Sequence, residues 1–263
     1  MDRTLPLLVV SPHFDDAVLS AFDLITRPGA TVMTVFTSGP TVTTKTKWDQ
    51  ACGFPDSAEA MATRRREDDA AFDGIAGQRV FLGLNEGQYR DGRPLDEDVA
   101  ILVDAVRSWT SEHPGCTVAL PVGAGGPVTL LHRIRYKVPM HRIGLCGGSE
   151  PSSEHVWVRD RLLDALDSGT GLCLYEELPY LWVRRGDAEA SRAAQRLNLT
   201  AKVTNTFVHL AAKAARIECY SSQRGVIFAP WMRLPDHLPA TERTWTLEPA
   251  ESEARRERMW SGH

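Results

Sequence analysis

The strongest constraint on the fold lies near the N-terminus, where an apolar segment leads directly into three potential metal ligands. Residues 7–10 are apolar and predict a buried strand; His13, Asp15 and Asp16 follow it at once. The pattern at 17–19 then predicts the start of a helix. In open α/β sheets, ligands bind beyond the carboxyl ends of the strands. This stretch therefore predicts an imidazole and two carboxylates at the mouth of such a crevice.

These residue types suit a catalytic metal, because zinc takes nitrogen and oxygen ligands and keeps an open position for water at catalytic sites. In that interpretation His13 and Asp16 bind the metal, and Asp15 is free to take a proton from water. The alternative is that one aspartate caps the helix and His13 is an ordinary turn residue. One aspartate suffices for a cap, but short motifs also match by chance, so spacing alone leaves both interpretations open.

Strand-like and helix-like segments alternate along the rest of the chain. This order predicts a Rossmann-like α/β fold: a single domain with a mostly parallel sheet flanked by helices. No Gly-x-Gly-x-x-Gly follows the first strand, which disfavours a dinucleotide site. Further strands are expected at 32–37, 79–84, 117–121, 172–180 and 226–231, and helices at 57–76, 96–111, 187–197 and 204–217. Residues 40–56 are expected to form a polar loop. The domain is expected to end at residue 247, and residues 248–263 to form a charged tail.

Composition narrows the class of protein further. The net charge of −4 gives no electrostatic case for a nucleic-acid partner. No run of 18 apolar residues and no apolar signal region occurs, so we expect a cytoplasmic protein with no membrane partner. The five cysteines are odd in number and widely spaced, without a Cys-x-x-Cys pair, so we expect reduced, mostly buried thiols.

Residues 11–17, Ser-Pro-His-Phe-Asp-Asp-Ala, resemble the Pro-His-x-Asp-Asp signature of the PIG-L/LmbE-like family of zinc-dependent N-acetylglucosaminyl deacetylases. The resemblance covers most of residues 5–185, and the order of its parts makes it specific. Further matching segments are 32–37, 48–54, 64–72, 82–90 and 154–160.

The resemblance implies one zinc ion (Zn2+) per chain, held by His13, Asp16 and His155, with Asp15 as the general base. His155 opens a predicted helix. Zinc is the expected metal, although a His-Asp-His set also suits iron and other divalent metals. The preceding Glu154 stands at the position of a family aspartate and is expected to orient a neighbouring imidazole.

The resemblance also points to substrate-binding residues. An arginine of the helix at 57–76 reaches the substrate side in the family; Arg65 is our choice here, with Arg64 as the alternative. Glu86 is the expected sugar contact. Ser152 stands where the family has a histidine, which leaves open the group that protonates the departing amine. Three histidines are candidates for that role: His132, His141 and His209.

Two further features bear on the pocket. Residues 127–150 form a stretch that the family relatives lack; it is basic and partly apolar, and is either a lid or specificity loop or an incidental surface excursion. Glu176 or Glu177, at the exit of the strand predicted at 172–180, is expected to face the site.

The predicted activity is zinc-dependent hydrolysis of an N-acetyl amide on an amino sugar or glycosylated metabolite, with release of acetate. The partner would be a small-molecule amino-sugar substrate. Three alternatives stay open at this point: an amidase of thiol conjugates such as mycothiol, a catalytically impaired sugar-binding homologue, and a nucleotide-binding α/β domain.

Overall fold

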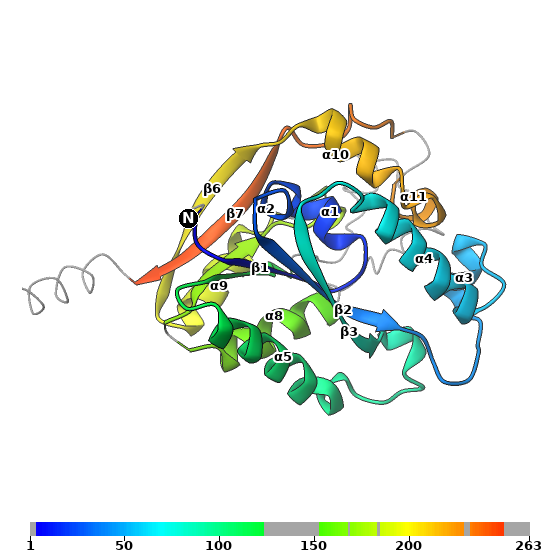
Figure 1. Ribbon diagram of the computed structural model, residues 1–263, viewed down its shortest axis with the longest axis horizontal. Coiled ribbons are helices and arrows are strands. Elements are labelled where there is room, and N and C mark those ends of the chain that lie inside the picture. Colours follow the sequence, from blue (N-terminus) through cyan, green and yellow to red (C-terminus); the bar gives the residue numbers. More distant parts are fainter. Residues whose placement is uncertain (1–3, 124–152, 168, 183–184, 229–231, 250–263) are drawn as a thin grey trace, which may run out of the picture.

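The computed structural model describes residues 4–123, 153–167, 169–182, 185–228 and 232–249. They form one α/β domain around a seven-stranded sheet with the order β3-β2-β1-β4-β5-β7-β6 (Figure 1). The first five strands are parallel, and β7 pairs antiparallel with both β5 and β6. The predicted Rossmann-like, mostly parallel sheet is thus confirmed. The strands are β1 (Leu7–Ser11), β2 (Ala30–Ser38), β3 (Gly77–Asn85), β4 (Thr117–Pro121), β5 (Gly171–Tyr175), β6 (Leu199–Phe207) and β7 (Thr241–Pro249).

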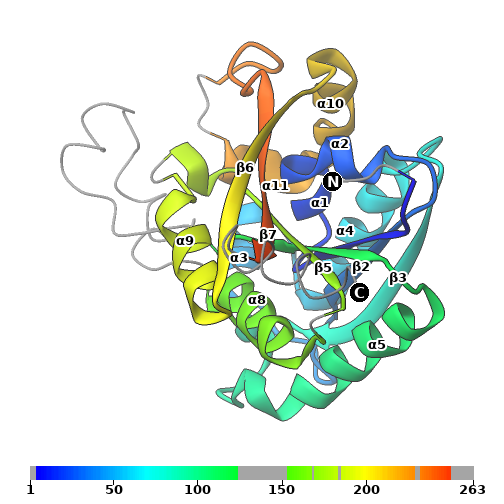
Figure 2. The same cartoon turned by 90° about the vertical axis from the view of Figure 1, so that its left-hand side faces the viewer.

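Helices cover both faces of this sheet (Figure 2). One face packs against α1 (Asp16–Ser20), α2 (Phe22–Ile25), α4 (Ser57–Ala71), α10 (Leu210–Ile217) and α11 (Ser221–Ile227). The other packs against α5 (Val99–Glu112), α8 (Ser153–Ala165) and α9 (Asp187–Arg196). The short α3 (Lys47–Cys52) lies beside α4 and α11, and the 3-10 turns are η1 (Gly87–Tyr89), η2 (Leu95–Asp98) and η3 (Tyr180–Trp182). No helix among the described residues has the length and apolar character to cross a bilayer.

β1 is the central strand and explains why residues 7–10 are uniformly apolar. Leu7 and Val9 enter the core on one face, while Leu8 and Val10 enter the core on the other. A strand that is buried on both faces needs an apolar residue at each position rather than an alternating pattern. β1 lies between β2 and β4, so its exit turn emerges in the middle of the sheet edge.

The expectation of a loop throughout residues 40–56 is wrong, because Lys47–Cys52 forms α3. Thr46 and Asp49 form a capping box: the Thr46 side chain accepts from the Asp49 N–H at 3.1 Å, and the Asp49 carboxylate accepts from the Thr46 N–H at 2.8 Å. Gly53 ends the helix in the left-handed conformation, with φ of 82°.

The C-terminal third departs most from expectation. Residues 204–207, expected to be helical, complete β6, and α10 begins only at Leu210. Val226 and Ile227, expected in a strand, end α11, and residues 229–231 lie outside the described part. The strand β7 was not predicted, and it includes residues 248 and 249 of the expected charged tail.

The four cysteines in the described residues are free thiols, as expected. Cys116 and Cys173 are buried, whereas Cys52 and Cys219 are only partly so. Cys146 lies outside the described residues.

Candidate metal centre

The turn after β1 is held in a defined shape by its own side chains. The Ser11 hydroxyl donates to the His13 carbonyl at 2.7 Å and accepts from the Ala17 N–H at 3.1 Å. The His13 N–H donates to Asp16 Oδ2 at 2.8 Å. Asp15 occupies the N-cap position of α1, but its side chain makes no capping hydrogen bond. A capping role for Asp15 is therefore wrong, and its carboxylate is available for other chemistry.

Three ligand atoms converge at this turn. His13, Asp16 and His155 each offer one atom, and these atoms lie within 4.8 Å of one another. Asp16 Oδ2 is 3.1 Å from His13 Nδ1 and 3.2 Å from His155 Nε2, and the two ring nitrogens are 3.2 Å apart. His155 comes from the first turn of α8, far along the chain. The fold thus brings together the three side chains that the sequence had proposed as ligands.

A carboxylate lies behind each imidazole. His13 Nε2 is 2.9 Å from Glu154 Oε2, and His155 Nδ1 is 2.5 Å from Glu177 Oε1. Glu177 Oε2 also accepts from the Gly123 N–H at 2.7 Å. Such partners place the imidazole proton on the outer nitrogen and leave a lone pair on the inner one. The predicted orienting role of Glu154 agrees with this contact, and Glu177 is the strand-exit glutamate that faces the site.

The charges of the neighbouring side chains shift the pKa values of Asp16 and His155 in directions that favour positive charge at the cluster. Burial alone would raise the pKa of Asp16 and lower that of His155, but their mutual attraction reverses both effects. The pKa of Asp16 falls well below its ordinary value, and that of His155 rises to about 9 with help from Glu177. The carboxylates of Asp16 and Glu177 thus favour positive charge at this point. Metal binding displaces a proton from each ring, and the two inner ring nitrogens and the carboxylate oxygen are then a donor set that zinc accepts, so the residues present fit the metal.

Asp15 has the opposite environment from its neighbour. Burial, together with the charge of Asp16, raises the pKa of Asp15 to about 6, although Arg64 and His13 act to lower it. Its side chain stands outside the group of three ligands. Adjacent carboxylates with pKa values displaced in opposite directions are typical of sites that divide binding and proton transfer between two groups.

Of the two candidate arginines, the structure brings Arg64 to the site. Arg64 is 3% exposed and forms an ion pair with Glu86, and its charge acts on Asp15. Arg65, our choice from the sequence, lies on the outer side of α4, where it stacks on Phe81 at 3.6 Å. The position of Arg64 on the helix could have identified it from the sequence, because Arg64 lies three and four residues after two buried residues of the inner face. These are Ala60 and Met61.

The other predicted substrate-binding positions have different outcomes. Glu86 is 5% exposed, and its carboxylate accepts from Arg64 and from Gln88 Nε2, the latter at 2.5 Å. A sugar contact by Glu86 remains a prediction. Ser152, the stretch 127–150 and the two histidines within it lie outside the described residues. His209 is exposed and caps α10 by accepting from the Ala212 N–H at 3.1 Å.

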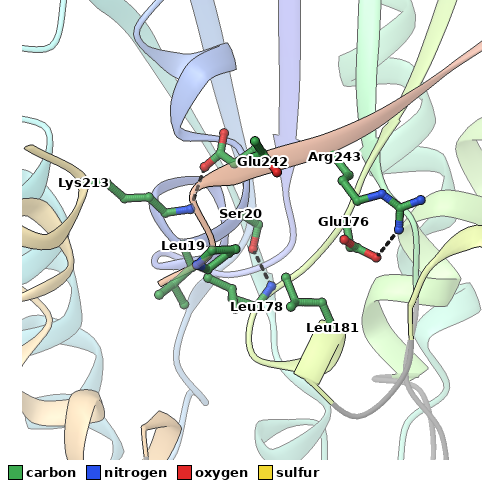
Figure 3. A pocket seen from close by; sticks show the side chains of 10 residues that line it. Leu19, Ser20, Glu176, Leu178, Leu181, Lys213, Glu242 and Arg243 are labelled. Atoms are coloured by element: carbon green, nitrogen blue, oxygen red, sulfur yellow. Dashed lines mark hydrogen bonds and ion pairs between the residues drawn. The ribbon is translucent and has the colours of Figure 1, made fainter. Parts of the chain in front are cut away.

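A separate hollow lies between α1, α10, the exit of β5 and the start of β7 (Figure 3). Its charged side chains pair with one another: Lys213 with Glu242 at 2.6 Å, and Arg243 with Glu176 at 3.2 Å. None of the three proposed ligands lines it. We therefore place the chemistry at the β1 exit turn rather than in this hollow.

No family model and no curated protein matches the chain. Solved structures do match it. A zinc-inhibited form of teicoplanin deacetylase Orf2 has a TM-score of 0.70 at 22% identity, with 94% of this chain and 99% of the other covered. The A40926 pseudoaglycone deacetylase Dbv21 has 0.63 at 24% identity, covering 94% and 98%. A deacetylase–teicoplanin complex has 0.63 at 21% identity, covering 94% and 99%. The predicted resemblance to zinc-dependent deacetylases is thus confirmed at the level of the fold.

Proposed function

We propose that this protein is a zinc-dependent deacetylase that hydrolyses the N-acetyl amide of an amino sugar carried by a larger metabolite. The observation that carries the proposal is the convergence of His13, Asp16 and His155 on one point beside a spare, buried carboxylate, Asp15. A purely structural turn would not need two imidazoles, each with a glutamate carboxylate behind it. The arrangement supports a metal centre with a base next to it.

His13, Asp16 and His155 would hold the zinc, which would supply a Lewis acid that polarises an amide carbonyl and makes water more acidic. The protein supplies the proton transfers. Asp15 accepts a proton from the water whose oxygen attacks the carbonyl carbon. Its pKa, raised to about 6, suits a base that works near neutral pH. When the C–N bond breaks, the protonated Asp15 returns that proton to the departing amine, and acetate and a free amino sugar are released.

The structural neighbours support a large glycosylated substrate. Two of them are deacetylases named for teicoplanin and for the A40926 pseudoaglycone. We propose that this chain acts on a substrate of the same chemical class, a sugar attached to a bulky aglycone. The buried Arg64, held by Glu86 next to Asp15, is placed to meet a polar group of the sugar near the scissile amide.

The test is acetate release from N-acetylglucosamine, from other N-acetylated amino sugars and from N-acetylated glycopeptides, with and without a chelator. We expect turnover that chelation abolishes and zinc restores. Asp15→Asn should lower kcat by roughly 10²–10⁴-fold, the usual contribution of a general base, while zinc remains bound. Asp164→Asn, at an exposed ion pair on α8, is the matched control.

Each contrary result has a definite meaning. Full activity of Asp15→Asn would overturn the assignment of the base. Zinc bound without acetate from any substrate would favour the catalytically impaired, sugar-binding homologue instead. Acetate release that is indifferent to chelators would remove the metal from the reaction.

A further inference from the structure

The β1 exit turn receives a hydrogen bond from the C-terminal part of the chain. The Tyr220 hydroxyl lies 3.2 Å from the Phe14 carbonyl oxygen, although the two residues are 206 positions apart. Phe14 stands between His13 and Asp15. Tyr220 immediately precedes α11 and is only 2% exposed. A buried side chain from the other end of the sequence thus contacts the backbone next to the proposed base.

The Tyr220 hydroxyl is itself held in place by α4. Its oxygen lies 2.8 Å from Asp68 Oδ1, so its single proton faces two acceptors, this carboxylate and the Phe14 carbonyl. Asp68 is fully buried and forms an ion pair with Arg79 of β3. One carboxylate oxygen of Asp68 faces Arg79 and the other faces Tyr220, which fixes where the hydroxyl lies.

The same helix also contacts the side chain of Phe14. The Arg64 guanidinium lies 5.9 Å from the centre of the Phe14 ring, within the range of a cation–π contact. Arg64 and Asp68 are one helical turn apart on the inner face of α4. Phe14 is therefore held by α4 at two points, directly at its ring and, through Tyr220, at its carbonyl group.

These contacts matter for Asp15, because its carboxylate makes no capping hydrogen bond that would direct it. The Phe14 carbonyl belongs to the planar peptide unit that ends at the Asp15 nitrogen. The next peptide unit is held by α1, since the Asp15 carbonyl accepts from the Leu19 N–H at 2.9 Å. With both flanking peptide planes held, the backbone determines the direction of the Asp15 Cα–Cβ bond.

We propose that Tyr220 is a positioning residue for the reaction: its hydroxyl holds the peptide plane between Phe14 and Asp15 and so keeps the Asp15 carboxylate beside the metal centre. The inference rests on the proposed function in that it takes Asp15 as the base. It goes further by giving the start of α11 a role in the site, although α11 supplies none of the three proposed ligands. Tyr220 itself contacts neither the metal nor the substrate in this proposal.

The test is a double-mutant cycle on acetate release, with Tyr220→Phe, Asp15→Asn and the two changes combined. Tyr220→Phe removes only the hydroxyl and should lower kcat by roughly 10–100-fold, since a misplacement of about 1 Å can cost a factor on the order of 10². KM and zinc affinity should stay as in the wild type. In the Asp15→Asn background the same change should have no further effect, because Tyr220 acts through Asp15.

Ser222→Ala is the matched control, because it also removes one hydroxyl contact between α11 and α4. The Ser222 hydroxyl donates to Glu67 Oε2 at 2.6 Å. This variant should keep the wild-type kcat. Equal losses of kcat in Ser222→Ala and Tyr220→Phe would show that the Tyr220 hydroxyl only anchors α11. A loss that persists undiminished in the Asp15→Asn background would likewise overturn the proposal.

A second readout needs no turnover. The ¹³C shift of a carbonyl group responds to the hydrogen bonds that it accepts, so Tyr220→Phe should move the Phe14 carbonyl resonance, whereas Ser222→Ala should not. If Tyr220→Phe does not fold, 3-fluorotyrosine at position 220 keeps the hydroxyl as a stronger donor and should move the same resonance. An unmoved resonance in the folded variant contradicts the proposal. Absence of acetate release by the wild type would instead overturn the proposed function, and the two failures are therefore distinguishable.

Discussion

At the scale of single residues, the role of each buried carboxylate near the site depends on its hydrogen-bond partners. Glu176 and Glu177 are adjacent and both buried, yet only Glu177 contacts an imidazole, that of His155 at 2.5 Å. Glu176 instead accepts from the Gly186 N–H at 2.9 Å and from Arg243 at 3.2 Å. Successive side chains of an extended chain point to opposite sides, which separates two chemically identical neighbours.

This contrast provides a matched pair of variants. Glu177→Gln removes the charge behind His155 and should lower zinc affinity by roughly 10–100-fold. Glu176→Gln makes the same chemical change one residue away and should leave zinc affinity unchanged. Chelator competition at constant pH measures both. Equal affinities for the wild type and Glu177→Gln would show that His155 does not need its carboxylate partner.

At the scale of elements, the C-terminal strand is held to the helical layer by a buried ion pair. Lys213 of α10 donates to Glu242 Oε1 of β7 at 2.6 Å, and both residues are largely buried. The same carboxylate accepts from the N–H groups of Phe22 and Asp23 at 2.9 and 2.8 Å, at the start of α2. Three elements that lie far apart in the sequence thus meet at one glutamate.

Removing only the Lys213 charge of this ion pair should lower the stability of the folded protein. Lys213→Met leaves the Glu242 carboxylate buried without its countercharge, so the free energy of unfolding should fall by roughly 3–5 kcal/mol. Combining it with Glu242→Gln, which removes the stranded charge, should recover part of that loss. Urea denaturation measures both variants, with Arg66→Met at an exposed pair as the control. If Lys213→Met is as stable as the wild type, the ion pair between Lys213 and Glu242 does not hold β7 in place.

At the scale of the whole molecule, the metal centre joins the exit of β1 to the start of α8. A ligand that binds only the folded chain stabilises it by RT ln(1 + [L]/Kd), so the effect grows with the logarithm of the ligand concentration relative to Kd. Zinc at about 100 times its Kd should contribute ~2.7 kcal/mol, which corresponds to a rise in Tm of roughly 5–10 °C for a domain of this size.

Thermal denaturation with added zinc and with a chelator measures this effect. His155→Ala should show no zinc-dependent rise in Tm, because only two ligands remain. An equal rise in the wild type and in His155→Ala would place the stabilising zinc elsewhere in the molecule.

Local sequence determined the parallel half of the fold and the metal-binding turn. Residues 7–10 specify a strand buried on both faces, and His13 and Asp16 lie so close behind it that no distant contact is needed to bring them together. The strands at 79–84 and 117–121 were equally clear from their apolar character. Their order along the chain, with helices between them, predicted a parallel sheet.

Only the tertiary structure decided the rest, because it depends on contacts between segments far apart in sequence. β6 and β7 are too polar to be predicted from an apolar pattern. β7 becomes a strand by pairing with β5, and β6 by pairing with β7. The choice of Arg64 over Arg65 depends on the face that α4 turns to the sheet. The reach of Glu154 to His13 depends on where α8 begins relative to β1. Sequence supplies such groups, but the distances between them are set by packing.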